Sequence, residues 1–304
     1  MNDRLKRIIS NPGIIFLGLG GRGFFKWMND RTYLRIAYRL NLHEKLNLDT
    51  PEGYNAKLQW MKLYDHRPEY VRMVDKYEAK RYVAQIIGDQ YIIPTIGVWD
   101  RFDDIDFGKL PDQFVLKCTH DSGGLVICKD KRKFNKAEAR EKIEGCLKKS
   151  YYWQGREWPY KKVKPRIIAE AYMEDSVTHD LRDYKFFSFD GVVRALFIAT
   201  ERQTEGEDTK FDFFDANFKH LNLTHGHANA DNPPDKPLNF DEMVKLASAL
   251  SKGYPQLRID LYEVNGRVYF GELTLFHHGG LVPFKPKKWD KIFGDWIDLP
   301  IEQG

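Results

Sequence analysis

The strongest chemical signal in the sequence is a pair of strand-like runs near its C-terminal end, joined by the turn dipeptide Asn265-Gly266. Side chains alternate along a strand, so Arg258 and Asp260 share one face of the first run, and Glu272 and Thr274 share one face of the second. Carboxylates held close together repel unless a cation lies between them. Such oxygen ligands suit Mg²⁺, which binds through one or two carboxylates plus substrate phosphates. The pattern predicts a magnesium site, and its alternative is an ordinary hairpin with a solvated charged face.

The register of this hairpin decides between the two interpretations. A two-residue turn at Asn265-Gly266 places Glu272 opposite Ile259, on the wrong face. Bringing Glu272 opposite Asp260 requires an odd number of loop residues, three for instance, or a bulge beside Gly266. We predict the odd loop.

A second signal is the sequence from Phe114 to Ile127, which resembles a strand, a short glycine loop and another strand. Lys117 near the end of the first strand could reach a phosphate. Ser122, Gly123 and Gly124 would let backbone N–H groups approach the same anion. The Walker pattern GxxxxGK[ST] is absent from the sequence. By itself this motif is equally typical of a plain hairpin that contains two glycines.

Two weaker signals follow. The apolar strand 166–172 leads into Met173, so backbone groups at its edge could bind an adenine while Met173 packs on the ring; the alternative is a buried strand that leaves the core. In the next run Lys185 interrupts aromatic residues, where it either snorkels to solvent or faces a phosphate.

The elements that position these residues can be read from capping and periodicity. Three helices start at a polar N-cap with glutamate three positions later: Asp75 with Glu78, Asn135 with Glu138, and Asn239 with Glu242. Seven strand-like runs are predicted, at 113–118, 125–128, 167–172, 184–189, 192–199, 258–264 and 268–275. The turn signals Asp190-Gly191 and Asn265-Gly266 predict antiparallel hairpins. The fold class is therefore α+β and not a doubly wound parallel sheet.

Composition excludes several classes of protein. The chain has 304 residues, is 42% hydrophobic and has a net charge of +4 with dispersed basic residues, so disorder and nucleic-acid binding are disfavoured. No apolar run has the roughly 18 residues that a membrane span needs. The three cysteines show no CxxC spacing, which favours a reducing, cytoplasmic setting. The dyad His225 and His227 is interpreted as solvated loop histidines and not as a metal site.

The charge is concentrated at the N-terminal end. Residues 1–42 carry a net charge of +6 together with aliphatic and aromatic side chains, while the rest of the chain sums to −2. Basic and apolar residues together could rest on an anionic membrane surface, here the inner face. The favoured interpretation is a helical layer docked on the main domain.

In their order along the chain, these motifs resemble the ATP-grasp superfamily, and most closely the TupA-like ATP-grasp family of polysaccharide-biosynthesis loci. The resemblance covers residues 58–280, extends to the preceding run 54–63, and includes the helix start at Asp75-Lys76. It implies two α+β subdomains that grip ATP, with an N-terminal helical extension. The implied boundaries are 1–74 for the extension, 75–165 for the N-terminal subdomain with the phosphate loop, and 166–304 for the C-terminal subdomain with the hinge, the metal hairpin and the acceptor loop.

The family pattern also implies roles for matching residues. The implied contacts with the ATP phosphates are Lys76, Lys117, Lys185 and Arg258. The implied loop that covers the phosphates is Ser122, Gly123 and Gly124. The adenine hinge is Glu170, Ala171, Tyr172 and Met173, and the ribose contact is Asp180. The Mg²⁺ ligands are Asp260 and Glu272, with Thr274 where the family's Glu-x-Asn motif has asparagine. The acceptor side is His277, His278, Gly279 and Gly280.

The chemistry that the resemblance implies is ATP- and Mg²⁺-dependent carboxylate–amine ligation through an acyl phosphate. The substrates would be a uronic acid or amino acid of a capsular or teichuronic-type polysaccharide and an amine acceptor. Two other functions are weighed against it. One is a glycosyltransferase of the same pathway, which would need a DxD-like metal motif; the sequence has the acidic residues Asp103, Asp104 and Asp106, but nothing connects them to a sugar-nucleotide fold. The other is an ATP-binding protein without catalytic activity.

Overall fold

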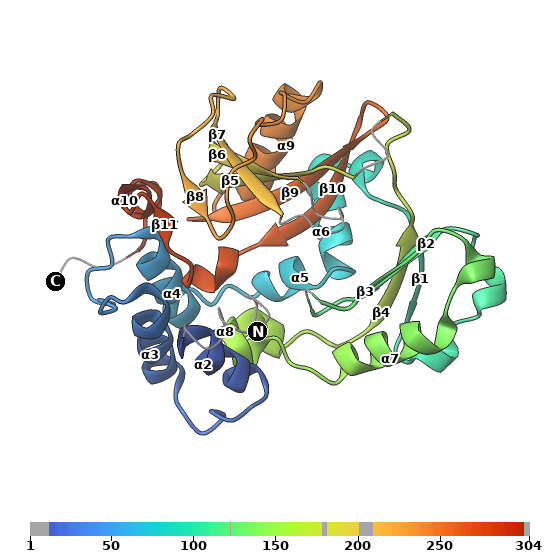
Figure 1. The fold of residues 1–304 in the computed structure, drawn as a ribbon, viewed down its shortest axis with the longest axis horizontal. Coiled ribbons are helices and arrows are strands. Elements are labelled where there is room, and N and C mark those ends of the chain that lie inside the picture. Colours follow the sequence, from blue (N-terminus) through green and yellow to red (C-terminus); the bar gives the residue numbers. More distant parts are fainter. Residues whose placement is uncertain (1–11, 122, 178–180, 201–208, 301–304) are drawn as a thin grey trace.

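The computed structural model describes residues 12–121, 123–177, 181–200 and 209–300. It is built on two antiparallel sheets with helices between and around them (Figure 1). The predicted α+β class is thus confirmed. Beyond the predicted strands, the described residues contain β1 (Thr95–Trp99), β7 (Lys210–Asp215) and the short pair β8 (Thr224–His225) and β11 (Phe284–Lys285).

The smaller sheet has the order β1-β4-β2-β3. Its other strands are β2 (Phe114–Cys118), β3 (Leu125–Cys128) and β4 (Ile167–Ala171). Helix α7 (Lys136–Leu147) packs on one face, which Phe114, Leu116 and Cys118 fill with apolar groups. The side chains of Val115 and Lys117 alternate to the opposite face, which is left open for a ligand. Strand β4 follows the predicted subdomain boundary at residue 165, yet it pairs with β1 and β2, which precede that boundary. The division of the chain into subdomains at this residue stays a prediction.

The larger sheet has the order β10-β9-β5-β6-β7. It contains β5 (Asp183–Phe189), β6 (Val192–Thr200), β9 (Leu257–Val264) and β10 (Arg267–Thr274). Helix α9 (Phe240–Ser251) covers one face, where Phe240 lies 6.1 Å from Phe186 between ring centroids. Polar and charged residues of β5, β9 and β10 alternate to the other face, so the sheet offers one apolar and one reactive side.

The remaining helices connect and buttress the two sheets. Helices α5 (Tyr70–Val74) and α6 (Glu78–Ile87) lie between the sheets in Figure 1. The first described residues form α2 (Pro12–Gly21) and α3 (Asp30–Leu42), which pack with α4 (Tyr54–Tyr64) and α8 (Tyr152–Gly155). Helix α10 (Lys288–Asp295) closes the fold against α4. Short 3-10 turns complete the connections: η1 (Asp89–Tyr91), η2 (Phe102–Asp104), η3 (Phe107–Lys109), η4 (Lys131–Lys133), η5 (Trp158–Lys161) and η6 (His277–Gly280).

The three predicted helix starts illustrate what a capping motif can show. At α7, the Asn135 side chain accepts a hydrogen bond from the N–H of Glu138 at 3.1 Å, as a capping box requires. Before α6, Asp75 accepts from the N–H groups of Tyr77 and Glu78. At α9 the helix is present but the capping explanation is wrong, because Asn239 makes no side-chain cap and instead donates to Glu263.

Candidate active site

The C-terminal hairpin brings Asp260 opposite Glu272, but not by the predicted route. Arg267 pairs with Val264 across a two-residue turn, so the odd loop that we predicted is wrong. The shift comes from a β-bulge at Gly271, between Phe270 and Glu272. A Cβ atom at Gly271 would lie 2.8 Å from the Tyr262 ring and 3.0 Å from the Asp260 carbonyl oxygen, so the bulge needs glycine.

Asp260 is the centre of a buried charge cluster on the reactive face. Arg258 donates to both of its carboxylate oxygens, at 2.7 and 2.8 Å, and Lys185 from the neighbouring strand also contacts it. Lys185 is shared with Asp183, whose oxygen lies 2.6 Å from its ammonium nitrogen. Burial opposes ionisation of Asp260, but the two cations outweigh it and lower its pKa. Asp260 is therefore ionised, and its contacts hold the side chains of Arg258 and Lys185 in fixed positions.

Glu272 differs from Asp260 in its exposure and its partners. Its side chain is 34% exposed, and Lys76 contacts it at 3.9 Å from beyond the sheet. Glu272 and Asp260 are cross-strand neighbours, so two carboxylates, the ligand type that Mg²⁺ prefers, lie on the same face of the hairpin. In this structure Arg258 and Lys185 contact the oxygens of Asp260, whereas Glu272 is open to a ligand. Thr274 lies farther along the same face, opposite Arg258. Lys76 also donates to the carbonyl oxygen of Asp121, beside the predicted phosphate loop.

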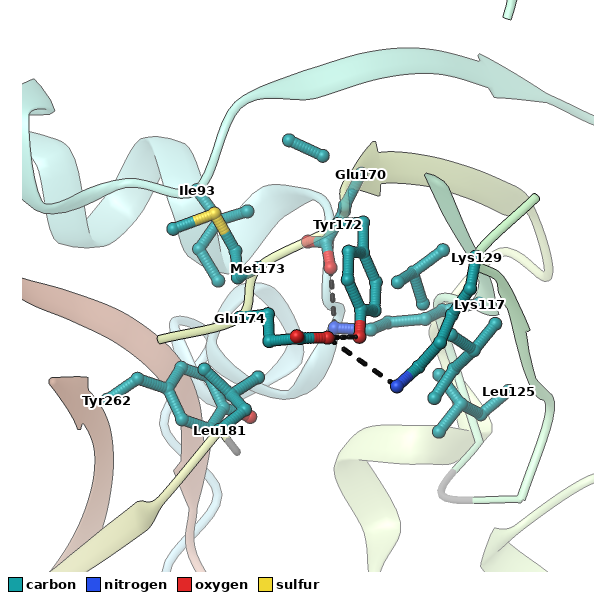
Figure 2. Close-up of a pocket in the computed structure, with 13 residues that line it drawn as sticks. Ile93, Lys117, Leu125, Lys129, Glu170, Tyr172, Met173, Glu174, Leu181 and Tyr262 are labelled. Carbon is teal, nitrogen blue, oxygen red and sulfur yellow. Dashed lines mark hydrogen bonds and ion pairs between the residues drawn. The ribbon is translucent and has the colours of Figure 1, made fainter. Parts of the chain in front are cut away.

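The open face of the smaller sheet forms a cavity of about 380 Å³ (Figure 2). Its walls are apolar and aromatic, with Met173, Tyr172 and Ala171 from the predicted hinge on one side and Leu125 and Ile127 of β3 on another. The lining residues that the sequence analysis did not assign include Ile93, Lys129, Glu174, Leu181 and Tyr262. Tyr262 belongs to β9 of the larger sheet, so the cavity lies where the two sheets meet. Its size and lining suit a planar heterocycle.

Glu170 lines the same cavity but is held by two lysines. Lys80 and Lys117 each lie 2.5 Å from one of its carboxylate oxygens. Burial would raise the pKa of Glu170, yet the two ammonium groups lower it to about 2. Lys80 escaped the sequence analysis, although a lysine beside Ala79 and Val83 on the buried face of α6 could have indicated a buried ion pair.

Acid should therefore remove the contribution of Glu170 to stability. Its pKa is about 2 in the folded chain and about 4.3 when unfolded, so its stabilisation is present above about pH 4.3 and is lost as the pH falls towards 2. We expect Glu170→Gln to lower the free energy of unfolding at pH 7 by about 3–5 kcal/mol, because Lys80 stays buried without its counter-ion. Urea denaturation of both proteins at several pH values measures this difference. A difference that does not shrink in acid would contradict the assignment.

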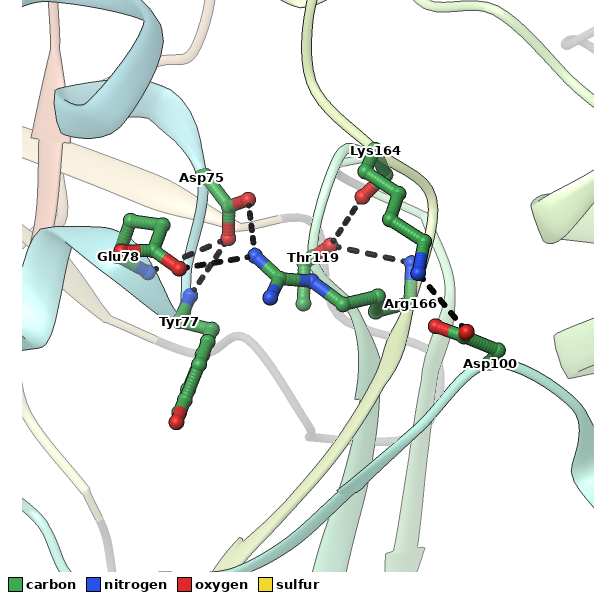
Figure 3. Close-up of polar contacts among 7 residues, drawn as sticks. All are labelled: Asp75, Tyr77, Glu78, Asp100, Thr119, Lys164 and Arg166. Carbon is green, nitrogen blue, oxygen red and sulfur yellow. Dashed lines mark hydrogen bonds and ion pairs between the residues drawn. The ribbon is translucent and has the colours of Figure 1, made fainter. Parts of the chain in front are cut away.

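A largely buried network of polar contacts around Arg166 connects the start of α6 to the ends of β2 and β4 (Figure 3). Arg166, directly before β4, donates to Asp75 at 2.8 Å and to Glu78 at 3.2 Å. Thr119, directly after β2, joins these two segments through its backbone. Its carbonyl oxygen accepts a hydrogen bond from the Lys76 N–H, and its own N–H donates to the Arg166 carbonyl oxygen. The start of α6 is thereby locked to the ends of β2 and β4, and two of the predicted phosphate lysines lie in one region.

Helix α4 supports the predicted acceptor loop from behind. The buried Gln59 donates to the carbonyl oxygens of Gly279 and Gly280, and the buried Lys62 donates to those of Gly279 and Gly155. Burial lowers the pKa of Lys62 and raises the pKa of the neighbouring Glu157. The carbonyl groups of Gly279 and Gly280 are thus used by the fold. Residues 54–63, to which the sequence analysis gave no function, therefore hold the predicted acceptor loop in position.

Replacing Lys62 with methionine should loosen this support. The substitution removes the Lys62 hydrogen bonds to the Gly155 and Gly279 carbonyl oxygens, of which Gly279 keeps only the one from Gln59, and it leaves Glu157 without its nearby cation. We therefore expect a loss of about 3 kcal/mol in the free energy of unfolding. Urea denaturation measures the loss, with the exposed Lys245→Met as control. Equal stabilities of the two variants would show that Lys62 does not carry the loop.

The other predicted residues are placed as follows. His277 is buried, and its Nδ1 accepts from Arg258 at 2.6 Å. His278 follows it, and His225 is also buried, so the interpretation of His225 as a solvated loop residue is wrong. Gly123 and Gly124 follow β2, whereas Ser122 and Asp180 lie outside the described residues. Asp103 and Asp104 pair with Arg140 and Arg101, and Asp106 caps the Gly108 N–H, which accounts for that acidic run locally.

This chain is similar to one known protein family and to several solved structures. A family model described as TupA-like ATPgrasp matches residues 56–298. A search of the curated proteins finds no match. Similar solved structures include D-alanine–D-alanine ligases from Bacillus anthracis (15% identity, TM-score 0.35) and Helicobacter pylori (12%, 0.45), and the ATP-grasp ligase PsnB with minimal precursor, Mg and ADP (10%, 0.39). The alignments cover 74%, 83% and 84% of this chain, and 59%, 68% and 65% of those chains. The chain therefore spans less than two thirds of the Bacillus anthracis ligase and of PsnB.

Proposed function

The chain belongs to the TupA-like ATP-grasp family, and from this premise we propose that it is an ATP-dependent carboxylate–amine ligase. The observation that carries the proposal is that the charged face of the larger sheet and the open face of the smaller sheet lie next to each other. The larger sheet contributes Asp260, Glu272 and Arg258, and the smaller sheet contributes Lys117 and the adenine-sized cavity. Lys76 links them, since it lies 3.9 Å from Glu272 and contacts the loop after β2.

In this proposal the cavity takes the adenine and the lysines take the phosphates. Ala171, Tyr172 and Met173 provide the hinge, and Lys117 and Lys76 contact the phosphate tail. Asp260 and Glu272, with Thr274 beside them, would hold Mg²⁺, which supplies neutralisation of phosphate charge when bound. Arg258 and Lys185 would bind the transferred phosphoryl group, and their fixed contacts with Asp260 keep them oriented.

The reaction has two steps. A substrate carboxylate oxygen attacks the γ-phosphorus, and the bond to the bridging oxygen breaks to release ADP and leave an acyl phosphate. The amine nitrogen then attacks the acyl carbon and loses a proton, while phosphate departs with the bonding electron pair. Arg258 and Lys185 stabilise the negative charge that develops on the phosphoryl oxygens.

Nucleotide release tests the proposal. Purified protein with ATP, Mg²⁺ and a panel of uronic acids, amino acids and amines should release ADP and phosphate only when a carboxylate and an amine are both present. Release of AMP and pyrophosphate, or of UDP from a UDP-sugar, would contradict the ligase and support adenylation or glycosyl transfer instead.

We propose further that the carboxylate belongs to a uronic acid or amino acid of a cell-surface polysaccharide, and that the protein works at a membrane surface. Support for the membrane contact comes from α2 and the turn that follows it. Phe24 and Trp27 are 63% and 79% exposed, and Ile14 and Ile15 are also exposed. Lys26 and other basic residues accompany them, a combination suited to anionic lipid. Among the helices of the described residues, none combines the length and apolar character needed to cross a bilayer.

Vesicle sedimentation tests the membrane contact. The protein should sediment with phosphatidylglycerol vesicles and not with neutral phosphatidylcholine vesicles. The double variant Phe24→Ser with Trp27→Ser should remain in the supernatant, whereas Val177→Ser, which replaces another exposed apolar residue, should sediment like the original chain. Equal sedimentation of both variants would exclude this surface.

A further inference from the structure

Three histidines from two distant segments meet beside Arg258. His225 ends β8, and His277 and His278 open the turn after β10. One ring nitrogen from each residue lies within 4.8 Å of the other two. In the part of the chain that the structure describes, His225 Nδ1, His277 Nε2 and His278 Nε2 are buried and have no hydrogen-bond partner. A buried polar atom without a partner costs free energy, so three such ring nitrogens around one centre indicate a shared ligand.

The remaining ring contacts hold these histidines in place. His225 Nε2 lies 3.0 Å from the Val282 carbonyl oxygen, to which it must donate, so its Nδ1 carries a free lone pair. The His225 ring also stacks on Phe284, with centroids 3.8 Å apart. A histidine that donates one ring N–H to a backbone carbonyl while the other nitrogen faces a shared centre has the typical arrangement of a metal ligand.

The backbone adopts uncommon conformations to bring these rings together. His278 has φ 50° and ψ 24°, a left-handed conformation that costs a non-glycine residue free energy and is concentrated at functional sites. Gly226, next to His225, has φ 86°, and a Cβ atom there would lie 3.0 Å from His278 Nε2. Glycine at 226 therefore leaves space beside the His278 nitrogen.

We propose that His225, His277 and His278 form a binding site for a divalent transition metal of the Zn²⁺ class. Imidazole nitrogen is a preferred ligand of such metals, and three protein ligands leave one coordination position for water or a substrate group. Metal–nitrogen bonds of about 2.0–2.1 Å place tetrahedral ligands about 3.3 Å apart. The distance between any two of the ring nitrogens, now at most 4.8 Å, therefore needs to shorten by about 1.5 Å at most. The turns that would move contain Gly226 and Gly279. This site is separate from the Asp260–Glu272 donor set, which is made of oxygen ligands.

Metal binding would act on Arg258 through His277. A guanidinium group can only donate, so its contact with His277 Nδ1 means that the proton of this ring is on Nε2. A metal at Nε2 displaces that proton to Nδ1, and the guanidinium NH1 must then withdraw from the ring. Arg258 keeps its two hydrogen bonds to Asp260. Metal binding at the histidine site is therefore linked to the loss of the hydrogen bond between the Arg258 guanidinium and His277.

Cobalt titration tests the site without ATP, so it is independent of the proposed ligase activity. Co²⁺ added to the untagged chain in excess Mg²⁺ should produce the strong visible absorption of a tetrahedral nitrogen site at one equivalent, and Zn²⁺ should abolish it. His225→Gln and His278→Gln should each weaken binding at least tenfold. His227→Gln, which removes an exposed histidine of the same turn, should bind as the original chain does.

The proposal would be overturned if the original chain showed no saturable Co²⁺ absorption, or if the His227 variant lost as much Co²⁺ affinity as the His225 and His278 variants. Because His225 is buried, thermal melting of each variant accompanies the titration. A His278→Gln variant that melts like the original chain but fails to bind Co²⁺ separates loss of the ligand from loss of the fold. A folded variant with unchanged affinity would assign the three nitrogens no role in metal binding.

Discussion

Glu272→Gln is expected to lower ATP turnover on the order of 10²–10³-fold while changing the free energy of unfolding by about 0.5 kcal/mol or less. The activity loss follows because the variant removes one carboxylate from the pair that would hold Mg²⁺. The stability is kept because Glu272 is one-third exposed and its nearest cation, Lys76, lies 3.9 Å away. Few other residues of the proposed site allow charge to be removed at so little structural cost.

The measurement pairs ADP release with urea denaturation of the same preparation. Glu141→Gln on the exposed face of α7 is the matched control, since it removes the same charge far from the site. Increasing Mg²⁺ should partly restore the Glu272 variant. Turnover equal to that of the control variant would remove Glu272 from the proposed metal site.

Asp260→Asn is expected to damage both stability and turnover. Asp260 is 1% exposed and receives hydrogen bonds from Arg258 and an ion pair from Lys185. Neutralising it leaves Arg258 buried without its main counter-charge, at a cost of about 3–5 kcal/mol. Because the asparagine cannot orient the guanidinium as a carboxylate does, ATP turnover should also fall at least as far as in Glu272→Gln.

A double variant separates these two effects. Arg258→Met with Asp260→Leu removes both charges of the pair, so much of the lost stability should return while turnover stays abolished. Urea denaturation and ADP release measure the two quantities. If the double variant recovers turnover along with stability, Arg258 and Asp260 serve the fold alone.

Local patterns predicted the strands of the reactive hairpin and the face that each polar residue takes. Alternation along β9 put Arg258 and Asp260 on one side, and the structure has them there, opposite the face covered by α9. The route by which Glu272 joins them could not be predicted. A bulge at Gly271 depends on the contact with Tyr262 across the strand pair, and periodicity along one strand contains no information about that contact.

Other residues were missed because their partners are distant in sequence. Lys80 is explained by Glu170, and His225 is buried by Val282 and Phe284, more than 50 positions later. Asn239 has the local pattern of a cap, but Glu263 from β9 captures its side chain. Strands β1 and β7 were also missed, since TIGVW and KFDFFD gain their strand pairing from β4 and β6. Tertiary contacts decided these cases and local propensity did not.

A crystal structure with Mg²⁺ and a non-hydrolysable ATP analogue tests the central picture most directly, because it needs no knowledge of the substrates. We expect the adenine ring between β3 and Met173, the phosphates between Lys117 and Arg258, and the metal on Asp260 and Glu272. A nucleotide bound elsewhere, or a metal that leaves both of those carboxylates untouched, would contradict it.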